Sequence, residues 1–198
     1  YEAFLFADNI TPIVLWPSAR HPVLWYYWFE HAIPKVLRKI QADLFLSPDG
    51  FASLKTKVPT LCVFHDIAFE HYPQFIPYLN QQFYQYYSPK YAQKVQRIAT
   101  VSQFSKTDII KQYNIAAEKI DVVYNGANPT CRPLNKAQKK AVWQQYTQGC
   151  PYFFFISAVH PRKNLARLLQ AFDLLKQQTQ SNTKLVVAGR MAWQNKNL

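Results

Sequence analysis

Short apolar runs alternate with amphipathic stretches along the chain, and each run ends in a polar or proline-containing loop. Runs of this length, rich in β-branched and aromatic residues, are typical of buried strands. Six of them predict strands, at Asp43–Ser47, Leu61–Phe64, Arg97–Ser102, Lys119–Tyr124, Tyr152–Ser157 and Lys184–Ala188. Because strands of this kind occur in parallel sheets that helices cover on both faces, the pattern predicts an α/β fold with a parallel sheet between layers of helices.

In the segments between these runs, apolar residues recur at the spacing of a helix. One helix is predicted to start at Ser105, with Asp108 three residues later in the manner of a capping box. Its buried stripe comprises Ile109, Ile110 and Tyr113. A stripe at helical spacing, which predicts core packing, follows the fifth run and comprises Leu165, Leu168, Leu169, Phe172 and Leu175.

The aromatic segment from Pro22 to Ile40 is less regular. Its apolar residues are Trp25, Trp28, Phe29, Ile33, Val36 and Leu37. Pro34 limits a single helix through the segment, because proline lacks the N–H that a helix interior requires. The aromatic side chains belong either to the core or to a face that contacts a membrane surface, and the sequence leaves both interpretations open.

The regular succession of predicted strands is interrupted between Asn125 and Pro151, where prolines and a run rich in Lys and Gln replace the apolar runs. A new apolar strand begins at Tyr152. The sequence therefore predicts a partial first domain over residues 1–128, a connector over 129–150 and the start of a second domain over 151–198.

Composition narrows the class of protein. Hydrophobic residues make up 49% of the 198 residues and charged residues 17%, which indicates a globular chain and argues against a disordered one. No window of about 18 uncharged apolar residues occurs, so no membrane-spanning helix is predicted. The three cysteines, Cys62, Cys131 and Cys150, have no metal-like spacing, and we interpret them as reduced thiols of a cytoplasmic protein.

The chain is basic, with 23 Lys and Arg against 11 Asp and Glu and a net charge of +12. This charge predicts an anionic partner, which could be nucleic acid, an anionic membrane face or a phosphorylated small molecule. The cations are spread over separate segments rather than gathered in one stripe, which disfavours nucleic acid.

Chemistry in parallel sheets collects where strands end, because the loops there face a crevice and helix amino termini present free N–H groups. His65 and Asp66 directly follow the second predicted strand. The imidazole of His65 can donate a hydrogen bond or orient a reacting group, and Asp66 can fix its tautomer or cap the next turn. Without further context, such a pair can equally well stabilise the loop.

A second loop, AVHPRKN over residues 158–164, lies between the fifth predicted strand and the leucine-rich helix. Arg162 and Lys163 come just before the amino terminus of that helix, so two cations and the positive end of the helix dipole converge there. This arrangement predicts a site for a diphosphate, whereas the alternative is a solvated basic loop.

Four motifs follow one another in the order and spacing of a known family: VFHDIAFEHYP, VSQFSKTDIIKQYNIAAEKIDVVYNGAN, FFISAVHPRKNLARLLQAF and KLVVAGRMAW. The sequence resembles the retaining glycosyltransferases of family 4, also called the glycosyl transferases group 1, and is nearest their mannosyltransferase-like branch. The resemblance extends from Ile33 to Trp193. It implies the GT-B architecture, in which a nucleotide-sugar donor and an acceptor meet between two Rossmann-like domains. In this chain, most of the first domain and the start of the second are expected.

The resemblance also assigns roles to residues. His65 matches the family's cleft histidine at the reacting sugar, and Lys163 matches the lysine that clasps the donor diphosphate. Asn125 and Gly126 match the pair that ends the first domain, where the hinge starts. Gly189 matches the glycine that closes the second strand of the donor domain.

Two departures from the family pattern bear on these roles. Many members have an Arg five residues before the lysine, where this chain has Ala158, so Arg162 is expected to supply the second cation. The family's later pair of glutamates, which holds the donor sugar and ribose, and its first strand with a Gly-rich loop are expected outside these 198 residues. The fragment alone is therefore expected to be inactive.

The resemblance implies transfer of a hexose to a glycan or lipid-linked acceptor, in polysaccharide biosynthesis, with no bound metal or cofactor. The expected location is cytoplasmic. With a lipid-linked acceptor, a basic first domain with exposed aromatic residues would lie on anionic membrane, whereas a basic charge without a membrane role is the alternative.

Two rival functions remain from the sequence alone. A sugar-nucleotide epimerase would share the fold and the diphosphate site but would release a changed nucleotide sugar without an acceptor. A basic nucleic-acid-binding module is the rival from another class, and the scattered cations disfavour it.

Overall fold

The computed structural model describes residues 5 and 7–190. The chain forms two compact units, Tyr1–Asn125 and Gly126–Leu198, and each contains its own parallel sheet. Helices and strands alternate along both units, so the fold is α/β as the apolar runs predict.

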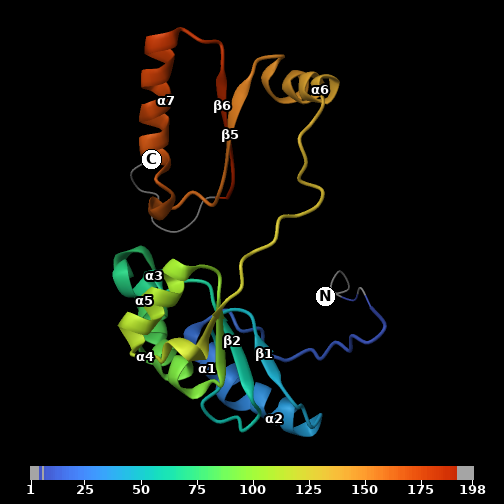
Figure 1. Ribbon diagram of the computed structural model, residues 1–198, viewed down its shortest axis with the longest axis vertical. Coiled ribbons are helices and arrows are strands. Elements are labelled where there is room, and N and C mark those ends of the chain that lie inside the picture. The colour runs from blue at the N-terminus through green and yellow to red at the C-terminus, as the bar shows by residue number, and fades with distance from the viewer. Residues whose placement is uncertain (1–4, 6, 191–198) are drawn as a thin grey trace. The chain divides into compact units, whose positions relative to one another are not determined.

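The first unit is built on a four-stranded parallel sheet in the order β1-β2-β3-β4 (Figure 1). Its strands are β1 Phe45–Ser47, β2 Thr60–Phe64, β3 Arg97–Thr100 and β4 Ile120–Val122. The register places Leu61 opposite Arg97 and Ile98 opposite Ile120. Because all strands run the same way, their carboxyl ends share one edge of the sheet, which we call the carboxyl edge, and their starts share the amino edge.

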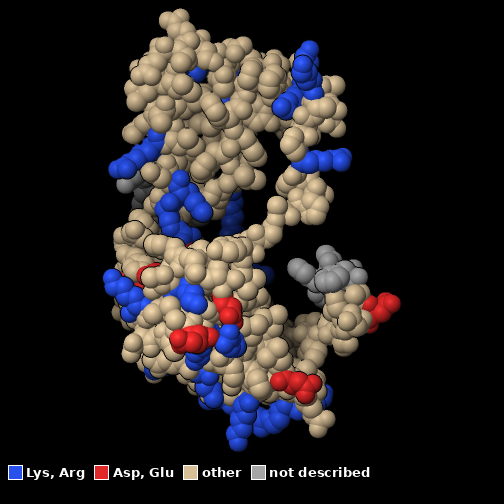
Figure 2. All heavy atoms as spheres, in the orientation of Figure 1, with Lys and Arg blue, Asp and Glu red and all other residues tan. Residues whose placement is uncertain are grey.

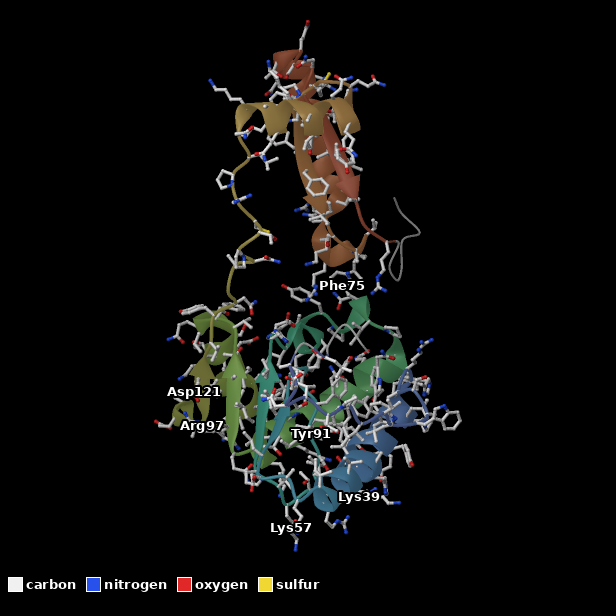
Figure 3. All side chains as sticks on the ribbon, turned by 90° about the vertical axis from the view of Figure 1, so that its right-hand side faces the viewer. Lys39, Lys57, Phe75, Tyr91, Arg97 and Asp121 are labelled. Atoms are coloured by element: carbon white, nitrogen blue, oxygen red, sulfur yellow. The ribbon has the colours of Figure 1, made fainter. Side chains whose placement is uncertain are left out.

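Both faces of this sheet are covered at its centre. Side chains of a strand point alternately to opposite faces, yet Ile98, Ala99 and Thr100 of β3 are all buried. The strand residues of the core are joined by residues of two helices, and together they include Cys62, Phe64, Tyr91, Ile98, Ile109, Tyr113 and Ile120. At the start of β3, the guanidinium of Arg97 forms an ion pair with Asp121 at 2.6 Å (Figure 3).

The helical segment before the sheet changes type along its length. It consists of α1 Pro22–Tyr27, a π-helical turn η2 Trp28–Ala32 and α2 Ile33–Lys39. The backbone N–H of Ile33 donates to the carbonyl of Trp28, five residues back, just before Pro34. The α-helical pattern is thus interrupted next to this proline, as the sequence predicts.

Some aromatic side chains of this segment pack in the core, and others are exposed at the surface. The Trp25 ring lies 5.4 Å from the rings of both Phe51 and Phe83, between centroids, so it packs on the core. Tyr26 and Tyr27 are exposed instead. The segment therefore contributes to the core and also presents aromatic residues at the surface.

The remaining helices of the first unit are α3 Ala68–His71, η3 Pro73–Phe75, α4 Tyr78–Lys94, α5 Gln103–Tyr113 and η4 Ala117–Lys119. The α5 helix begins earlier than the sequence predicts. Its N-cap is Ser102, whose hydroxyl accepts a hydrogen bond from the backbone N–H of Ser105 at 3.0 Å. The prediction of Ser105 as the cap was wrong, because Ser102 already satisfies the helix start.

The second unit comprises α6 Lys136–Thr147, β5 Tyr152–Ile156, η5 Pro161–Lys163, α7 Leu165–Thr179 and β6 Lys184–Ala188. Strands β5 and β6 pair in parallel, with Phe153 opposite Leu185. The α6 helix lies within the stretch predicted as a connector and begins with a capping box between Asn135 and Gln138. In the predicted stripe of α7, Leu165 is buried, whereas Leu169 is 45% exposed.

Among residues 5 and 7–190, no helix combines the length and the apolar character needed to cross a membrane. The three cysteines are unpaired thiols, of which Cys62 is buried and Cys131 exposed.

Candidate functional site

His65 lies at the carboxyl edge of the first unit, directly after β2, one of the two central strands. Its side chain is exposed at this edge. The ring atom Nε2 lies 3.0 Å from the backbone carbonyl oxygen of Pro48, in the loop that follows the neighbouring strand β1. The loop after β1 thus orients the imidazole.

This contact restricts the tautomer of His65. A carbonyl oxygen can only accept a hydrogen bond, so Nε2 must carry the proton that it donates to Pro48. In the neutral imidazole, Nδ1 is then the acceptor. The ring can therefore accept a hydrogen bond from a hydroxyl of a bound molecule through Nδ1.

Two serines at the start of α5 hold the backbone of His65. The Ser105 hydroxyl donates to the His65 carbonyl at 3.1 Å and accepts from the Ser102 hydroxyl at 3.0 Å. Ser105 is buried, so this chain of hydrogen bonds is protected from water. This role of Ser105 does not follow from the sequence pattern, which predicts the residue as the helix cap.

Asp66 caps the turn that follows. Its Oδ1 accepts a hydrogen bond from the backbone N–H of Ala68 at 2.9 Å, at the start of α3. This contact supports the capping interpretation of Asp66, one of the two that its position allows.

Two side-chain contacts then join α3 to α5. His71 Nε2 lies 2.8 Å from Asp108 Oδ2, and the Tyr113 hydroxyl donates to Glu70 Oε1 at 2.8 Å. Burial raises the pKa of the Glu70 carboxyl, and burial followed by the nearby Glu70 carboxylate raises the pKa of Tyr113. These contacts fix the segment after His65 against the helix that holds its backbone.

In the second unit, the carboxyl ends of β5 and β6 are locked together. The backbone N–H groups of Ser157 and Val159 donate to the carbonyls of Ala188 and Arg190, at 3.0 and 2.9 Å. Gly189 lies between the two acceptors and passes so close to Ser157 that only glycine fits. Its place in the structure is thus beside the loop that carries Arg162 and Lys163.

Arg162 and Lys163 occupy a single 3₁₀ turn, η5, directly before α7. His160 caps this turn, with Nδ1 accepting from the backbone N–H of Arg162 at 3.2 Å. The next residue, Asn164, has a left-handed backbone with φ of 54° and leads into Leu165, the first residue of α7. Both cations are exposed, at the amino terminus of a 15-residue helix. Such a turn can bind an anionic group through side chains and through first-turn N–H groups.

The net positive charge of the chain is concentrated in this second unit. Residues 126–198 contain 11 Lys and Arg and a single acidic residue, Asp173. Residues 1–125 contain 12 basic and 10 acidic side chains. The first unit is therefore only slightly basic, and most of the positive charge that would attract an anionic ligand belongs to the unit with Lys163.

The remaining predicted site residues lie where the two units meet along the chain. Asn125 is the last residue of the first unit and Gly126 the first of the second, and both are exposed. An added Cβ at Gly126 would meet no atom within 4 Å, so packing does not require glycine there. In the described part of the chain, no group of three or more His, Cys, Asp and Glu side chains gathers in the manner of a metal site.

Known proteins match both units. The model of the family "Glycosyltransferase Family 4" matches residues 2–130, and that of "Glycosyl transferases group 1" matches residues 138–197. The last residues of the fourth sequence motif, 191–193, fall in the second match but lie outside the described residues.

Two curated bacterial proteins are similar to the chain. "O-antigen chain mannosyltransferase B" of Escherichia coli is 30% identical over 135 residues, which are 67% of this chain and 35% of that protein. "O-antigen chain mannosyltransferase RfbU" of Salmonella typhimurium is 24% identical over 188 residues, 95% of this chain and 48% of that protein. The chain thus spans less than half the length of either relative.

Among solved structures, a glycosyltransferase from Rickettsia africae matches 91% of this chain and 55% of its own, with 17% identity and a TM-score of 0.49. The family matches, with two parallel sheets in consecutive α/β units, are those of an incomplete GT-B fold. The chain belongs to glycosyltransferase family 4 and is mannosyltransferase-like.

Proposed function

We propose that the full-length protein transfers a hexose from a nucleoside diphosphate to a hydroxyl of a glycan or lipid-linked acceptor, with retention at the anomeric carbon. The observation that carries this proposal is the cationic turn of Arg162 and Lys163 at the amino terminus of α7, in a chain of glycosyltransferase family 4. Both curated relatives are O-antigen chain mannosyltransferases, which supports mannose as the sugar and polysaccharide biosynthesis as the setting.

The role we assign to Lys163 is to bind the donor diphosphate, with Arg162 as the second cation. Negative charge builds up on the diphosphate as its bond to the sugar breaks, so fixed cations and helix N–H groups stabilise the transition state more than the ground state. Position 158 holds Ala, so the turn itself supplies the cations of this loop. Gly189 contributes by letting the loop that carries them approach β6.

His65 serves the reacting sugar in this proposal. With Nε2 donating to Pro48, the neutral ring presents Nδ1 as an acceptor for a sugar hydroxyl. Its role is to position the sugar rather than to attack it. Asn125 and Gly126 form the start of the hinge between an acceptor domain, 1–128, and a donor domain that begins at 151, with residues 129–150 as the connector.

The nucleotide sugar is the substrate in this scheme, and no metal or cofactor takes part. The protein acts in the cytoplasm or peripherally at its membrane face, and nucleic acid is not a partner. Because the chain spans less than half of its curated relatives, residues 1–198 alone are expected to lack activity.

Transfer assays on the full-length protein test the proposal. Labelled GDP-mannose and other nucleotide hexoses are supplied with lipid-linked or soluble glycan acceptors, and the anomeric configuration of the product is determined by NMR. Lys163→Ala should lower kcat/KM about 100-fold to 1,000-fold, the range for loss of one preorganised donor to a developing charge. Lys184→Ala is the matched control, because Lys184 is an exposed lysine of the same unit at the opposite end of β6.

Two outcomes would contradict the proposal. Equal activity of Lys163→Ala and Lys184→Ala would remove the diphosphate role of the turn. A changed nucleotide sugar formed without acceptor would indicate an epimerase instead.

A further inference from the structure

An uncharged stretch follows His71 in the first unit. Residues 72–89 contain no Asp, Glu, Lys, Arg or His, although 17% of the whole chain is charged. The stretch is rich in rings and amides instead, with seven aromatic residues and five Asn and Gln. It includes η3 and most of the α4 helix. Because a surface without charge attracts neither phosphate groups nor cations, this stretch is suited to a neutral ligand.

Rings on one side of α4 hold the helix on the core. Phe83 is buried, and its ring stacks on that of Tyr87 with 4.5 Å between centroids. The ring of Tyr84 stacks on Phe69 of α3 at 5.1 Å and on Trp25 of α1 at 5.5 Å. Core packing therefore explains this side of the helix and leaves its other side at the surface.

A second group of α4 side chains is exposed. Tyr78 and Tyr86 are 69% and 57% exposed, and Gln82 between them is exposed as well. The three residues are spaced four apart, which places them on one face of the helix. At about 1.5 Å per residue, the line from Tyr78 to Tyr86 is about 12 Å long. Two tyrosines with an amide between them thus lie in line on the helix surface.

This line starts towards the carboxyl edge of the sheet. Helix α4 connects β2 with β3, and a helix between two parallel strands runs back from their carboxyl edge to their amino edge. Its first residue, Tyr78, therefore lies at the edge that carries His65. Phe75, just before α4, lies at the end of the unit opposite Lys39 and Lys57 (Figure 3). Lys and Arg atoms gather at that other end, over α2 (Figure 2).

A further exposed ring lies at the carboxyl edge. Tyr72 is 51% exposed, and its ring stacks on that of Phe75 at 5.9 Å, with 15° between the ring planes. At the other end of the line, the Lys90 ammonium lies 3.1 Å from the centre of the Tyr86 ring. Rings held in place before binding lose little conformational entropy when a ligand packs on them. We use the name aromatic row for Tyr72, Tyr78, Gln82 and Tyr86.

Rings and amides without charge are the chemistry that recognises a glycan. A pyranose has C–H groups on its faces, and these pack on the electron-rich face of an aromatic ring. Its hydroxyls form hydrogen bonds with amide groups and with tyrosine hydroxyls, which both donate and accept. An anionic lipid surface or a nucleic acid would require cations, and residues 72–89 contain none.

We propose that the aromatic row binds a glycan, and that it holds earlier sugar units of a long acceptor chain while the terminal hydroxyl of that chain receives the hexose. The inference rests on the proposed function, because it takes the acceptor to be a glycan. It adds a dependence on acceptor length. A long chain makes contacts with the row that a short chain lacks, so the full-length protein is expected to prefer long acceptors.

Binding of manno-oligosaccharides to the full-length protein, measured by titration calorimetry without donor, tests the aromatic row. The unmodified protein should bind a hexasaccharide more tightly than a disaccharide. The double variant Y78A/Y86A should raise the Kd of the hexasaccharide about 10-fold, because it removes two ring contacts. In transfer assays, the KM for the hexasaccharide should rise more than the KM for the disaccharide.

Two further variants separate stacking from other effects. Y78F/Y86F keeps both rings and should bind the hexasaccharide more tightly than Y78A/Y86A does. The matched control is Y27A/Y146A, which removes two tyrosines that are 44% and 63% exposed and lie outside the row. It should retain hexasaccharide binding within about twofold. Unchanged thermal unfolding midpoints show that the variants remain folded.

Several outcomes would overturn the inference. These are no hexasaccharide binding by the unmodified protein, equal losses in Y78A/Y86A and Y27A/Y146A, or a loss in Y78F/Y86F as large as in Y78A/Y86A. An equal rise of both KM values would also overturn it, because the rings would then act on the fold or on the transfer step. Failure of the row leaves transfer to the disaccharide in place, whereas failure of the proposed function removes transfer to every acceptor.

Discussion

Gly189 and Ser157 lie in such close backbone contact that a Cβ at position 189 would be 1.7 Å from the Ser157 carbonyl oxygen. The contact joins the carboxyl end of β6 to the loop after β5, where hydrogen bonds from Ser157 and Val159 also converge. Gly189 further adopts a φ of 155°, which side chains rarely allow. The loop that carries Lys163 therefore depends on a glycine in the neighbouring strand end.

Gly189→Ala is expected to separate the two strand ends. The backbone conformation alone costs about 1–3 kcal/mol, and the clash with a carbonyl oxygen adds to this cost. Hydrogen exchange should show loss of protection at the amides of Ser157 and Val159, and donor binding should weaken with it. Gly126→Ala is the control, expected to stay within about 0.5 kcal/mol because nothing lies near an added Cβ there. Equal protection in both variants would contradict the prediction.

Much of the fold could be predicted, because buried parallel strands occur in the sequence as short apolar runs. Each of the six predicted strands is present, and the one at Lys184–Ala188 has the predicted bounds. The α4 helix was not predicted, because its 17 residues show no apolar periodicity. Tyrosines and glutamines occur all around the helix, and Pro89 lies within it. The buried side of α4 can be recognised only from its tertiary contacts, for example the contact between the rings of Phe83 and Trp25.

The candidate site could be predicted in part, from the types of its residues and from their positions directly after predicted strands. The positions of His65 and Lys163 after strands follow from the pattern, but their supporting contacts do not. The Pro48 carbonyl that orients His65 and the Ser105 hydroxyl that holds its backbone lie 17 and 40 residues away in the sequence. Contacts of this kind depend on the register of neighbouring elements, which hydrophobic patterning alone does not specify.

Glu30 predicts a contrast between two substitutions. Its side chain is 3% exposed, and Oε1 accepts a hydrogen bond from the backbone N–H of Leu54 at 3.0 Å. Glu30→Ala leaves that donor without its partner and should lower the free energy of unfolding by about 1–3 kcal/mol. Glu30→Gln keeps an acceptor and removes a buried charge, so it should be neutral or stabilising. Chemical denaturation of both variants checks this, and a loss in Glu30→Gln as large as in Glu30→Ala would refute the role of the hydrogen bond.

The cysteines should differ in reactivity. Burial raises the pKa of the Cys62 thiol to about 12, so the thiolate that reacts with alkylating reagents is scarce at neutral pH. Cys131 is exposed. Iodoacetamide followed by peptide mass spectrometry should label Cys131 in the folded protein and reach Cys62 only after unfolding. Labelling of both at similar rates before unfolding would mean that Cys62 is accessible.

Glu70 should make stability depend on pH. Burial raises the pKa of its carboxyl above the ordinary value of 4.5, so the folded protein binds this proton more tightly than the unfolded chain does. The stability from this group is complete below 4.5 and is lost as the pH rises through the folded-state pKa.

Glu70→Gln imitates the protonated carboxyl and keeps an acceptor for the Tyr113 hydroxyl. Relative to the unmodified protein, it should therefore have a higher thermal unfolding midpoint at neutral pH and lose that advantage below about pH 4.5. Midpoints measured across this range check the sign. A difference that does not change with pH would exclude Glu70 as its source.

Ser105 links the stability of the first unit to the proposed chemistry. Ser105→Ala removes the hydroxyl that donates to the His65 carbonyl, while the N–H of residue 105 keeps its bond to Ser102. A buried hydrogen bond of this kind contributes about 0.5–1.5 kcal/mol, so looser positioning of His65 should lower kcat about 2-fold to 10-fold.

Ser102→Ala is the counterpart: it removes the helix cap and should cost about 1 kcal/mol of stability, but it leaves the Ser105 donor in place. Measured at saturating donor, kcat should therefore fall more in Ser105→Ala and the unfolding midpoint more in Ser102→Ala. If kcat instead follows the midpoint in both variants, Ser105 acts on the fold alone and does not position His65.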